Sequence, residues 1–120
     1  MLFRSLYFLL LATAWMEDGG LAAWLIPSEF MDVNYGAALR RFLCDRVTLV
    51  RVHRFDPDDL QFGDAFVSSA ILVFRKTPPA SEHAVAFTFG GKLAEPVASE
   101  AIPLNRLRES RKWKIGRAHV

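Results

Sequence analysis

An aromatic side chain in a polar loop is the first candidate for chemistry in this sequence. Phe62 precedes Gly63 in the stretch QFGDAFVSSAILVF, and the apolar run that ends it, residues 70–74, predicts a buried strand. A flat ring just before a core strand can stack on a planar ligand at the edge of a sheet. An isolated phenylalanine beside a strand more often packs into the core. Residue type alone therefore leaves both interpretations of Phe62 open.

Polar residues after an apolar segment are the second candidate. Residues 21–26 show no alternation, which is typical of a strand covered on both faces in a parallel sheet, and Pro27 and Ser28 end this strand. Doubly wound folds place ligands beyond the carboxyl ends of such strands. Glu29 and Phe30 would then lie on a loop that faces a cleft. The same loop could be an ordinary connection that caps the next helix.

Other catalytic patterns are weak. His53, His83 and His119 have no regular spacing, so no metal site is predicted. Cys44 is the single cysteine, which excludes an intramolecular disulfide, and its apolar helical surroundings favour a core position over a nucleophile. The two Gly-Gly pairs have the composition of turns, so no glycine-rich phosphate loop is predicted. The pattern alone therefore assigns no catalytic residue.

The amino-terminal segment allows two interpretations. A basic start at Arg4, a short apolar run and an Ala-Thr-Ala triplet at residues 12–14 are typical of a signal peptide with its cleavage site. The apolar residues continue past that triplet, however, and a glycine turn at Gly19 leads into residues 21–26. These two features favour a buried helix over residues 1–16, followed by a tight turn and a strand.

A second helix and two more strands follow. The helical spacing over residues 35–45 predicts a helix with one apolar face and one charged face. The apolar face, toward the core, consists of Leu39, Phe42 and Leu43. The charged side chains expected to point outward are those of Arg40, Arg41 and Asp45. Strands are predicted over residues 47–53 and 62–74, joined by a polar turn over residues 54–59. No helix separates these two strands, which favours an antiparallel pair.

The remaining sequence is less regular. Residues 83–89 alternate like a half-exposed strand, and the Gly-Gly pair at residues 90–91 predicts a turn back toward residues 93–97. Residues 102–107 are ambiguous. Residues 114–120 resemble the translation of a common sequencing adapter. We therefore expect them to be a non-native tail that is not part of the fold.

Composition fits one domain. The chain has 120 residues, of which 52% are hydrophobic, enough for a core and also compatible with a piece of a larger protein. The net charge of +2 gives no overall signal for nucleic-acid binding. The positive charges gather in two spans, residues 40–54 and 106–114, and surface arginines are usually solvated, so these spans discriminate little.

Three stretches, taken together and in order, resemble one enzyme family. They are LAAWLIPSEFMDVNYGAALRRFL, VTLVRVHRF and LQFGDAFVSSAILVFRK. A strand ending in Pro-Ser is followed by an L-R-x-F-L helix, a strand, and a phenylalanine shortly before a V-S-x-A strand. This order is similar to the later part of the catalytic domain of adenine-specific DNA methyltransferases, in particular the TaqI-like and Eco57I-like restriction-modification methylases.

The resemblance implies a fold, a reaction and a pocket. The fold is α/β, namely the later strands of the Rossmann-like sheet of class I S-adenosylmethionine-dependent methyltransferases, with an antiparallel hairpin at the edge. The reaction is methyl transfer from S-adenosylmethionine to the exocyclic amine of an adenine flipped out of double-stranded DNA. Phe62 is similar to the phenylalanine that stacks on the flipped base. Pro27, Ser28, Glu29 and Phe30 would lie at the rim of the same pocket.

Other motifs of the family are missing from this chain. Its Gly-rich cofactor motif and its Asn-Pro-Pro-Tyr catalytic motif both lie upstream in the family, so no cofactor-binding residue is assigned here and we expect an isolated fragment to be inactive. The resemblance assigns residues 1–76 to the C-terminal part of the catalytic domain. Residues 77–113 are expected to form a linker and the start of the region leading to a target-recognition domain. The implied partners are double-stranded DNA and a restriction nuclease, fused or encoded nearby, with no membrane and a cytoplasmic location.

Two alternatives remain at this point. The chain could be a small secreted or interaction protein with an amino-terminal signal peptide, and a mature species beginning at Trp15 would favour that. It could instead be a methyltransferase that acts on RNA, protein or a small molecule. A full-length gene without an upstream Asn-Pro-Pro-Tyr motif would favour this second alternative.

Overall fold

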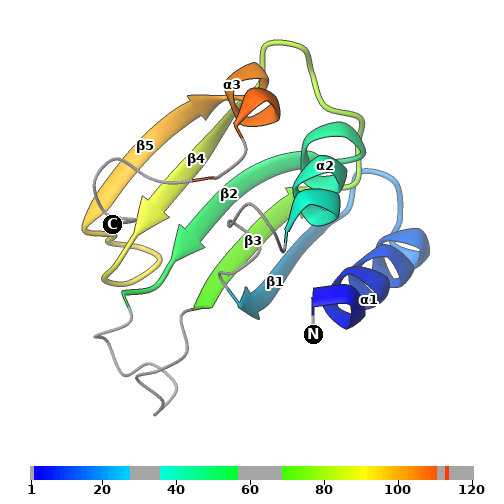
Figure 1. Ribbon diagram of the computed structural model, residues 1–120, viewed down its shortest axis with the longest axis horizontal. Coiled ribbons are helices and arrows are strands. Elements are labelled where there is room, and N and C mark those ends of the chain that lie inside the picture. Colours follow the sequence, from blue (N-terminus) through cyan, green and yellow to red (C-terminus); the bar gives the residue numbers. More distant parts are fainter. Residues whose placement is uncertain (1, 28–35, 57–68, 111–112, 114–120) are drawn as a thin grey trace.

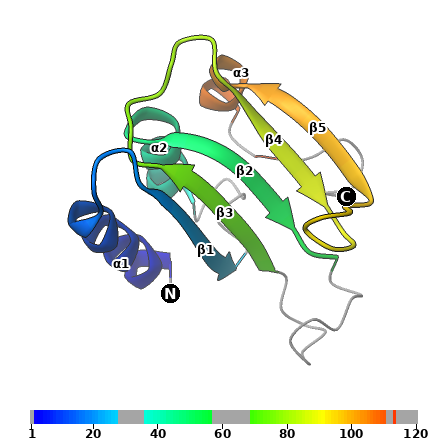
Figure 2. The ribbon, with the colours of Figure 1, turned by 180° about the vertical axis from the view of Figure 1, so that it is seen from behind.

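One mixed sheet with helices on one side forms the fold. The computed structural model describes residues 2–27, 36–56, 69–110 and 113. Within them the chain forms, in order, α1 (Leu2–Trp15), β1 (Leu21–Pro27), α2 (Ala37–Asp45), β2 (Thr48–Arg54), β3 (Ser69–Arg75), β4 (Ala84–Phe89), β5 (Ala98–Pro103) and α3 (Leu104–Glu109). The strands pair in the order β1-β3-β2-β4-β5. Figure 1 shows all three helices in front of the sheet, and Figure 2, from behind, shows the opposite face without a helix over it.

Strand direction determines which ends of the strands meet. The strand β3 runs antiparallel to both of its neighbours, β1 and β2, whereas β4 runs parallel to β2 and β5 antiparallel to β4. The carboxyl ends of β1, β2 and β4 therefore lie at one edge of the sheet, together with the start of β3. The expected α/β fold with an antiparallel β2–β3 pair is confirmed, but the pair lies inside the sheet and not at its edge, because β1 and β4 flank it.

The core lies between the sheet and the helices. Residues directly opposite each other on paired strands share a face, so Val52 and Leu72 point the same way, and both are buried. Phe74 lies on this face as well, and its ring meets that of Phe42 in α2 edge to face, with centroids 6.2 Å apart. Further along the sheet, Phe87 makes the same kind of contact with Trp113 at 5.8 Å. Aromatic side chains thus join α2 to β3, and Trp113, after α3, to β4.

The opposite face of the sheet carries exposed apolar side chains. Leu25 pairs with Ile71 and is 51% exposed, and Leu21 at the start of the same strand is 58% exposed. The prediction that residues 21–26 are covered on both faces in a parallel sheet is therefore wrong for this chain. An unbroken apolar run does not distinguish a covered central strand from an edge strand, and β1 is an antiparallel edge strand.

The first helix, turn and strand follow the predicted order. Gly19 has a φ of +84°, a conformation that glycine adopts without a steric penalty, and backbone hydrogen bonds in both directions join the turn to Lys76. The helix is not buried as expected, because Leu9 is covered while Phe8 and Trp15 are 55% and 78% exposed. None of the described helices is both long and apolar enough to cross a membrane.

The second helix confirms most of its predicted pattern. Its apolar face of Leu39, Phe42 and Leu43 is buried, and so is Cys44, as expected for a small core residue. The expectation that Arg40 points outward is wrong, because only 7% of this residue is exposed. It lies on the flank of α2 that faces α3, and the sequence of one helix cannot indicate what packs beside it.

The last part of the chain extends the same sheet. The predicted turn at the Gly-Gly pair leads back toward residues 93–97, and this stretch prolongs the turn, so that β5 begins at Ala98. Gly91 needs to be glycine there, because a Cβ atom would meet the carbonyl oxygen of Glu95 at 2.6 Å and its φ is +62°. The ambiguous residues 102–107 divide between the end of β5 and helix α3. The strands β4 and β5 belong to the sheet, while the assignment of residues 77–113 to a region leading to a recognition domain stays a prediction.

The central strand should dominate stability. Replacing Leu72 with alanine should lower the free energy of unfolding by about 2–5 kcal/mol, because its buried side chain leaves a cavity. The matched change Leu25→Ala removes the same atoms from a half-exposed position on β1 and should cost less than about 1 kcal/mol. Urea unfolding of both variants checks this, and equal losses would contradict the assignment of the core.

Candidate functional site

The two segments that carry the residues predicted from the sequence are joined to neighbouring strand ends at one edge of the sheet. Pro27 is the last residue of β1 and pairs with Ser69, the first residue of β3. The segment that follows Pro27 and the segment that precedes Ser69 therefore both join the sheet at this edge. Ser28, Glu29 and Phe30 belong to the first of these segments and Phe62 to the second, and all four lie outside the described residues.

A polar cluster on β2 and β4 lies near the same edge. His53 pairs with Thr88 across the parallel strands, and the imidazole Nδ1 lies 2.7 Å from the threonine hydroxyl. Arg51 donates a hydrogen bond from Nε to the same hydroxyl over 3.1 Å and another from Nη2 to the carbonyl of Leu93 over 2.5 Å. The arginine side chain thus joins β2 to the turn after β4 on the face without helices.

Burial and charge determine the protonation of His53. The hydroxyl of Thr88 accepts the Nε–H of Arg51 and shares a second hydrogen bond with Nδ1 of His53, in which either group can be the donor. Nε2 is buried and has no hydrogen-bond partner among the described residues. Burial lowers the pKa of His53 below its ordinary value, and the charge of Arg51 lowers it further. The imidazole is therefore neutral at pH 7.

Packing and backbone contacts complete this edge. The ring of Phe55 meets His53 edge to face, with centroids 4.7 Å apart. The amide of Phe55 donates to the carbonyl of Ser69, and the amide of Gly90 donates to the carbonyl of Arg54. The chain therefore stays bonded to β3 for one residue beyond β2, and the residue after β4 is bonded to the last residue of β2. Such an edge can hold the adjoining segments in place, which is what a binding site at the strand ends requires.

Sequence reasoning missed this cluster. It gave His53 a structural place in a strand, but it could not pair this residue with Thr88. The pairing joins residues that are far apart in the sequence through a parallel register, and no local pattern encodes that register. No group of histidine, cysteine and acidic residues suited to a metal ion occurs in the described part of the chain.

Three glycine amides of the turns are engaged within the fold. A phosphate or cofactor cradle needs free backbone amides. The amide of Gly19 donates to Lys76, that of Gly20 donates to Glu17, and that of Gly90 donates to Arg54. These three amides are therefore not available to a cofactor.

The buried imidazole should make stability depend on pH. A folded pKa below the unfolded value of about 6.5 means that the unfolded chain binds the proton more readily in this range. The stability due to neutral His53 is complete above about pH 6.5 and is lost as the pH falls toward the folded pKa. The change His53→Gln should therefore weaken the pH dependence of the free energy of unfolding between about pH 7.5 and pH 5.5. Denaturant unfolding at both values measures it, and an unchanged dependence would contradict the buried neutral state.

Two sequence relatives of the chain are type II methyltransferases. No protein-family model matches the chain. The chain is 31% identical over 111 residues to the type II methyltransferase M.XamI of Xanthomonas campestris pv. amaranthicola, which covers 92% of this chain and 21% of the relative. It is 32% identical over 73 residues to the type II methyltransferase M.AccI of Acinetobacter calcoaceticus, covering 59% of this chain and 14% of the relative.

A subunit of a restriction enzyme has a similar fold. The M protein of the type I restriction enzyme EcoKI superimposes with a TM-score of 0.58 over 72% of this chain and 19% of its own, at 21% identity. At this identity the likeness concerns the fold alone. The chain spans about a fifth or less of the length of the curated relatives that it matches. In sequence the chain is therefore similar to a part of type II methyltransferases, and its fold is similar to a part of the M protein of a type I restriction enzyme.

Proposed function

We propose that the chain supplies part of the catalytic domain of a DNA methyltransferase. The reaction is methyl transfer from S-adenosylmethionine to the exocyclic amine of adenine in double-stranded DNA. The observation that carries the proposal is the 31% identity to a type II methyltransferase, which extends over 92% of this chain. The choice of adenine rests on the order of motifs that ends in Phe62 and the following strand, similar to that of the adenine-specific enzymes.

The proposed contribution of this chain is one wall of the base pocket. Phe62 stacks on the flipped adenine, and the segment from Pro27 to Phe30 forms the rim. The pairing of Pro27 with Ser69 supports this, because the two segments that carry these residues leave the sheet from these paired positions. Stacking needs an aromatic face, and base–aromatic stacking contributes roughly 1–3 kcal/mol.

The methyl donor is assigned to another part of the parent enzyme. The chain contains no Asn-Pro-Pro-Tyr sequence, and the amides of Gly19, Gly20 and Gly90 are engaged within the fold. S-adenosylmethionine supplies the methyl group when bound there. The proposed partners are double-stranded DNA and a restriction nuclease, fused to the parent or encoded nearby, and the proposed location is the bacterial cytoplasm, where the DNA lies.

Changing Phe62 tests the role of this chain in the parent enzyme. In the full-length methyltransferase that contains this sequence, Phe62→Ala should lower kcat/KM for adenine methylation by about five- to 150-fold, because the stacking contribution is lost. The matched variant Phe62→Tyr retains the aromatic face and should stay within about threefold of the wild type. Mass spectrometry of methylated nucleosides measures both. Equal rates for the alanine variant and the wild type would exclude base stacking, and transfer to RNA, protein or a small molecule would replace the proposed substrate.

The isolated 120-residue chain should not transfer methyl groups. It contains neither the catalytic motif nor the cofactor motif of the family that it resembles. Incubation with radiolabelled S-adenosylmethionine and duplex DNA should give no incorporation above that of a heat-denatured control. Sustained methyl transfer by this chain would show that its own residues complete an active site.

A further inference from the structure

The turn between β4 and β5, residues 90–97, lies beside the strand ends from which the predicted pocket segments leave the sheet. The strand β4 runs parallel to β2, and the amide of Gly90 donates to the carbonyl of Arg54, so the turn begins next to the end of β2. Because neighbouring strands lie about 4.8 Å apart, the turn begins about 10 Å from the start of β3 and about 14 Å from the end of β1. Figure 1 shows the turn at the same end of the sheet as the arrowheads of β1, β2 and β4.

The turn has a backbone conformation that depends on its glycines. Gly90 and Gly91 have φ values of +70° and +62°, which only glycine adopts without a steric penalty. A Cβ atom on Gly90 would come within 3.3 Å of Cγ2 of Val97, so the absence of this atom leaves room for the valine side chain. The amides of Lys92 and Glu95 each donate to the carbonyl of the other residue. The turn is therefore formed in advance of any contact that it makes.

Arg51 fixes the turn to the sheet. Its guanidinium group donates from Nε to the hydroxyl of Thr88 on β4 and from Nη2 to the carbonyl of Leu93 in the turn. Two hydrogen bonds from one planar group hold the turn in a defined position relative to β2, which carries the arginine. Arg51 forms no ion pair with the carboxylates of the described residues, so its two bonds go to neutral oxygens.

The side chains that this turn exposes suit contact with DNA. Val97 is 78% exposed and Leu93 is 39% exposed. Lys92 is exposed as well, and it forms no ion pair within the part of the chain that the structure describes. Glu95 is the acidic residue of the turn, against the two positive charges of Lys92 and Arg51. Lysine ammonium groups bind DNA phosphates, and apolar side chains pack on base edges.

We propose that residues 90–97 contact the DNA duplex beside the flipped adenine and that Arg51 is the positioning residue of this turn. The proposal rests on the proposed function, which places the base pocket at the neighbouring strand ends. A flipped base stays attached to its duplex, so the base pairs beside it lie close to the pocket. Base pairs follow each other every 3.4 Å or so along a duplex, and a distance of about 10 Å therefore corresponds to about three base pairs. A turn that is already formed loses little conformational entropy when it binds.

The variant Lys92→Gln tests the contact in the full-length methyltransferase that contains this sequence. Titration with a short DNA duplex at several salt concentrations should show that the slope of log K against log salt falls by about 0.9, the value for one phosphate contact. Arg106→Gln is the matched control, because Arg106 is exposed but lies in α3, which follows the end of β5 at the opposite end of the sheet. Its slope should not change. An unchanged slope for Lys92→Gln, or an equal loss in both variants, would overturn the proposal.

Two substitutions of Arg51 separate its position from its charge. Arg51→Gln removes both hydrogen bonds, and Arg51→Lys keeps the charge but cannot make both bonds with one planar group. Both variants should raise KM for duplex DNA by about three- to tenfold and change kcat by less than about twofold, because the contact serves binding more than the chemical step. Hydrogen exchange at the amide of Val97 should become faster in both, while the amide of Leu72 in the core keeps its protection. A lysine variant with the KM of the wild type would exclude a positioning role.

Failure of this proposal can be told apart from failure of the proposed function. If Phe62→Ala lowers adenine methylation while Lys92→Gln leaves the salt dependence of duplex binding unchanged, the base pocket stands and the contact of the turn is excluded. If the wild type binds the duplex with the contribution of Lys92 but transfers no methyl group to it, the contact of the turn stands and the proposed function is excluded.

Discussion

The antiparallel insertion of β3 between β1 and β2 is the constraint on which the rest of this structure depends. Ala70, Leu72 and Phe74 on this strand are fully buried, so β3 supplies the middle of the core as well as hydrogen bonds to both neighbours. Because it runs opposite to β1 and β2, its start lies beside the ends of both. A third strand that ran parallel to β1 and β2 would have begun at the opposite ends of these strands. The segment before it would then have joined the sheet far from Pro27. The reversal of one strand therefore places the end of β1 and the start of β3, from which the segments with the predicted pocket residues leave the sheet, beside each other.

The same arrangement leaves the fold with two unlike faces. The face toward the helices is closed by aromatic contacts such as those of Phe42 with Phe74. On the other face, Leu21 and Leu25 remain largely exposed, and the buried residues His53 and Thr88 are held by polar contacts with each other and with Arg51. Buried polar groups are costly unless they are paired, so this cluster stabilises a single arrangement of β2 and β4 more than it adds to the overall stability.

The sequence patterns predicted the helices and strands that depend on nearby residues. They failed where packing against distant parts of the chain determines the burial or pairing of a residue. The period of α2 and the apolar runs of β2 and β3 arise within a few residues, and those elements were found. The apolar run of β1 gave no sign that one side would lack a partner, and the outward assignment of Arg40 failed because α3 comes from a distant part of the chain. The turn after β4 was predicted from its glycines, but its length depends on the pairing of β5. For the candidate site, the residues came from an ordered resemblance, whereas the His53–Thr88 pair needed a parallel register that no short pattern contains.

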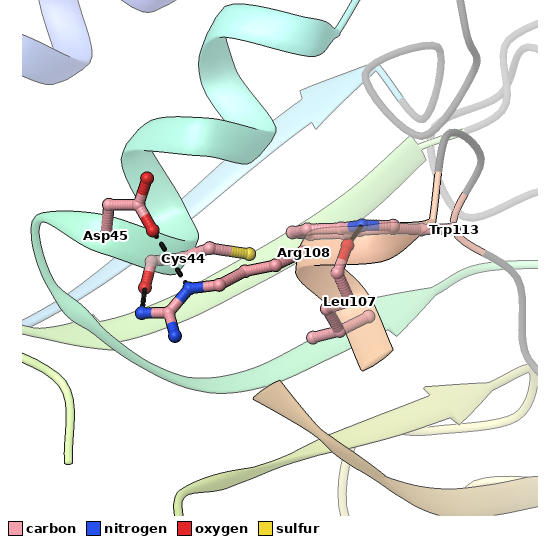
Figure 3. A network of polar contacts seen from close by, with 5 residues as sticks. All are labelled: Cys44, Asp45, Leu107, Arg108 and Trp113. Atoms are coloured by element: carbon pink, nitrogen blue, oxygen red, sulfur yellow. Dashed lines mark hydrogen bonds and ion pairs between the residues drawn. The ribbon is translucent and has the colours of Figure 1, made fainter. Parts of the chain in front are cut away.

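The contact between α2 and α3 joins the last part of the chain to its first. The ion pair of Arg108 with Asp45 is nearly half exposed, and pairs of this kind contribute less than about 1 kcal/mol, so stability alone gives it little importance. Arg108 also donates a second hydrogen bond to the carbonyl of Cys44, and this bond holds the guanidinium group against the end of α2 (Figure 3). Trp113 reinforces the junction, since its indole donates to the carbonyl of Leu107 while its ring packs on Phe87 in the sheet. Helix α3 is therefore held to α2 through Arg108 and, through the contacts of Trp113, to β4 as well.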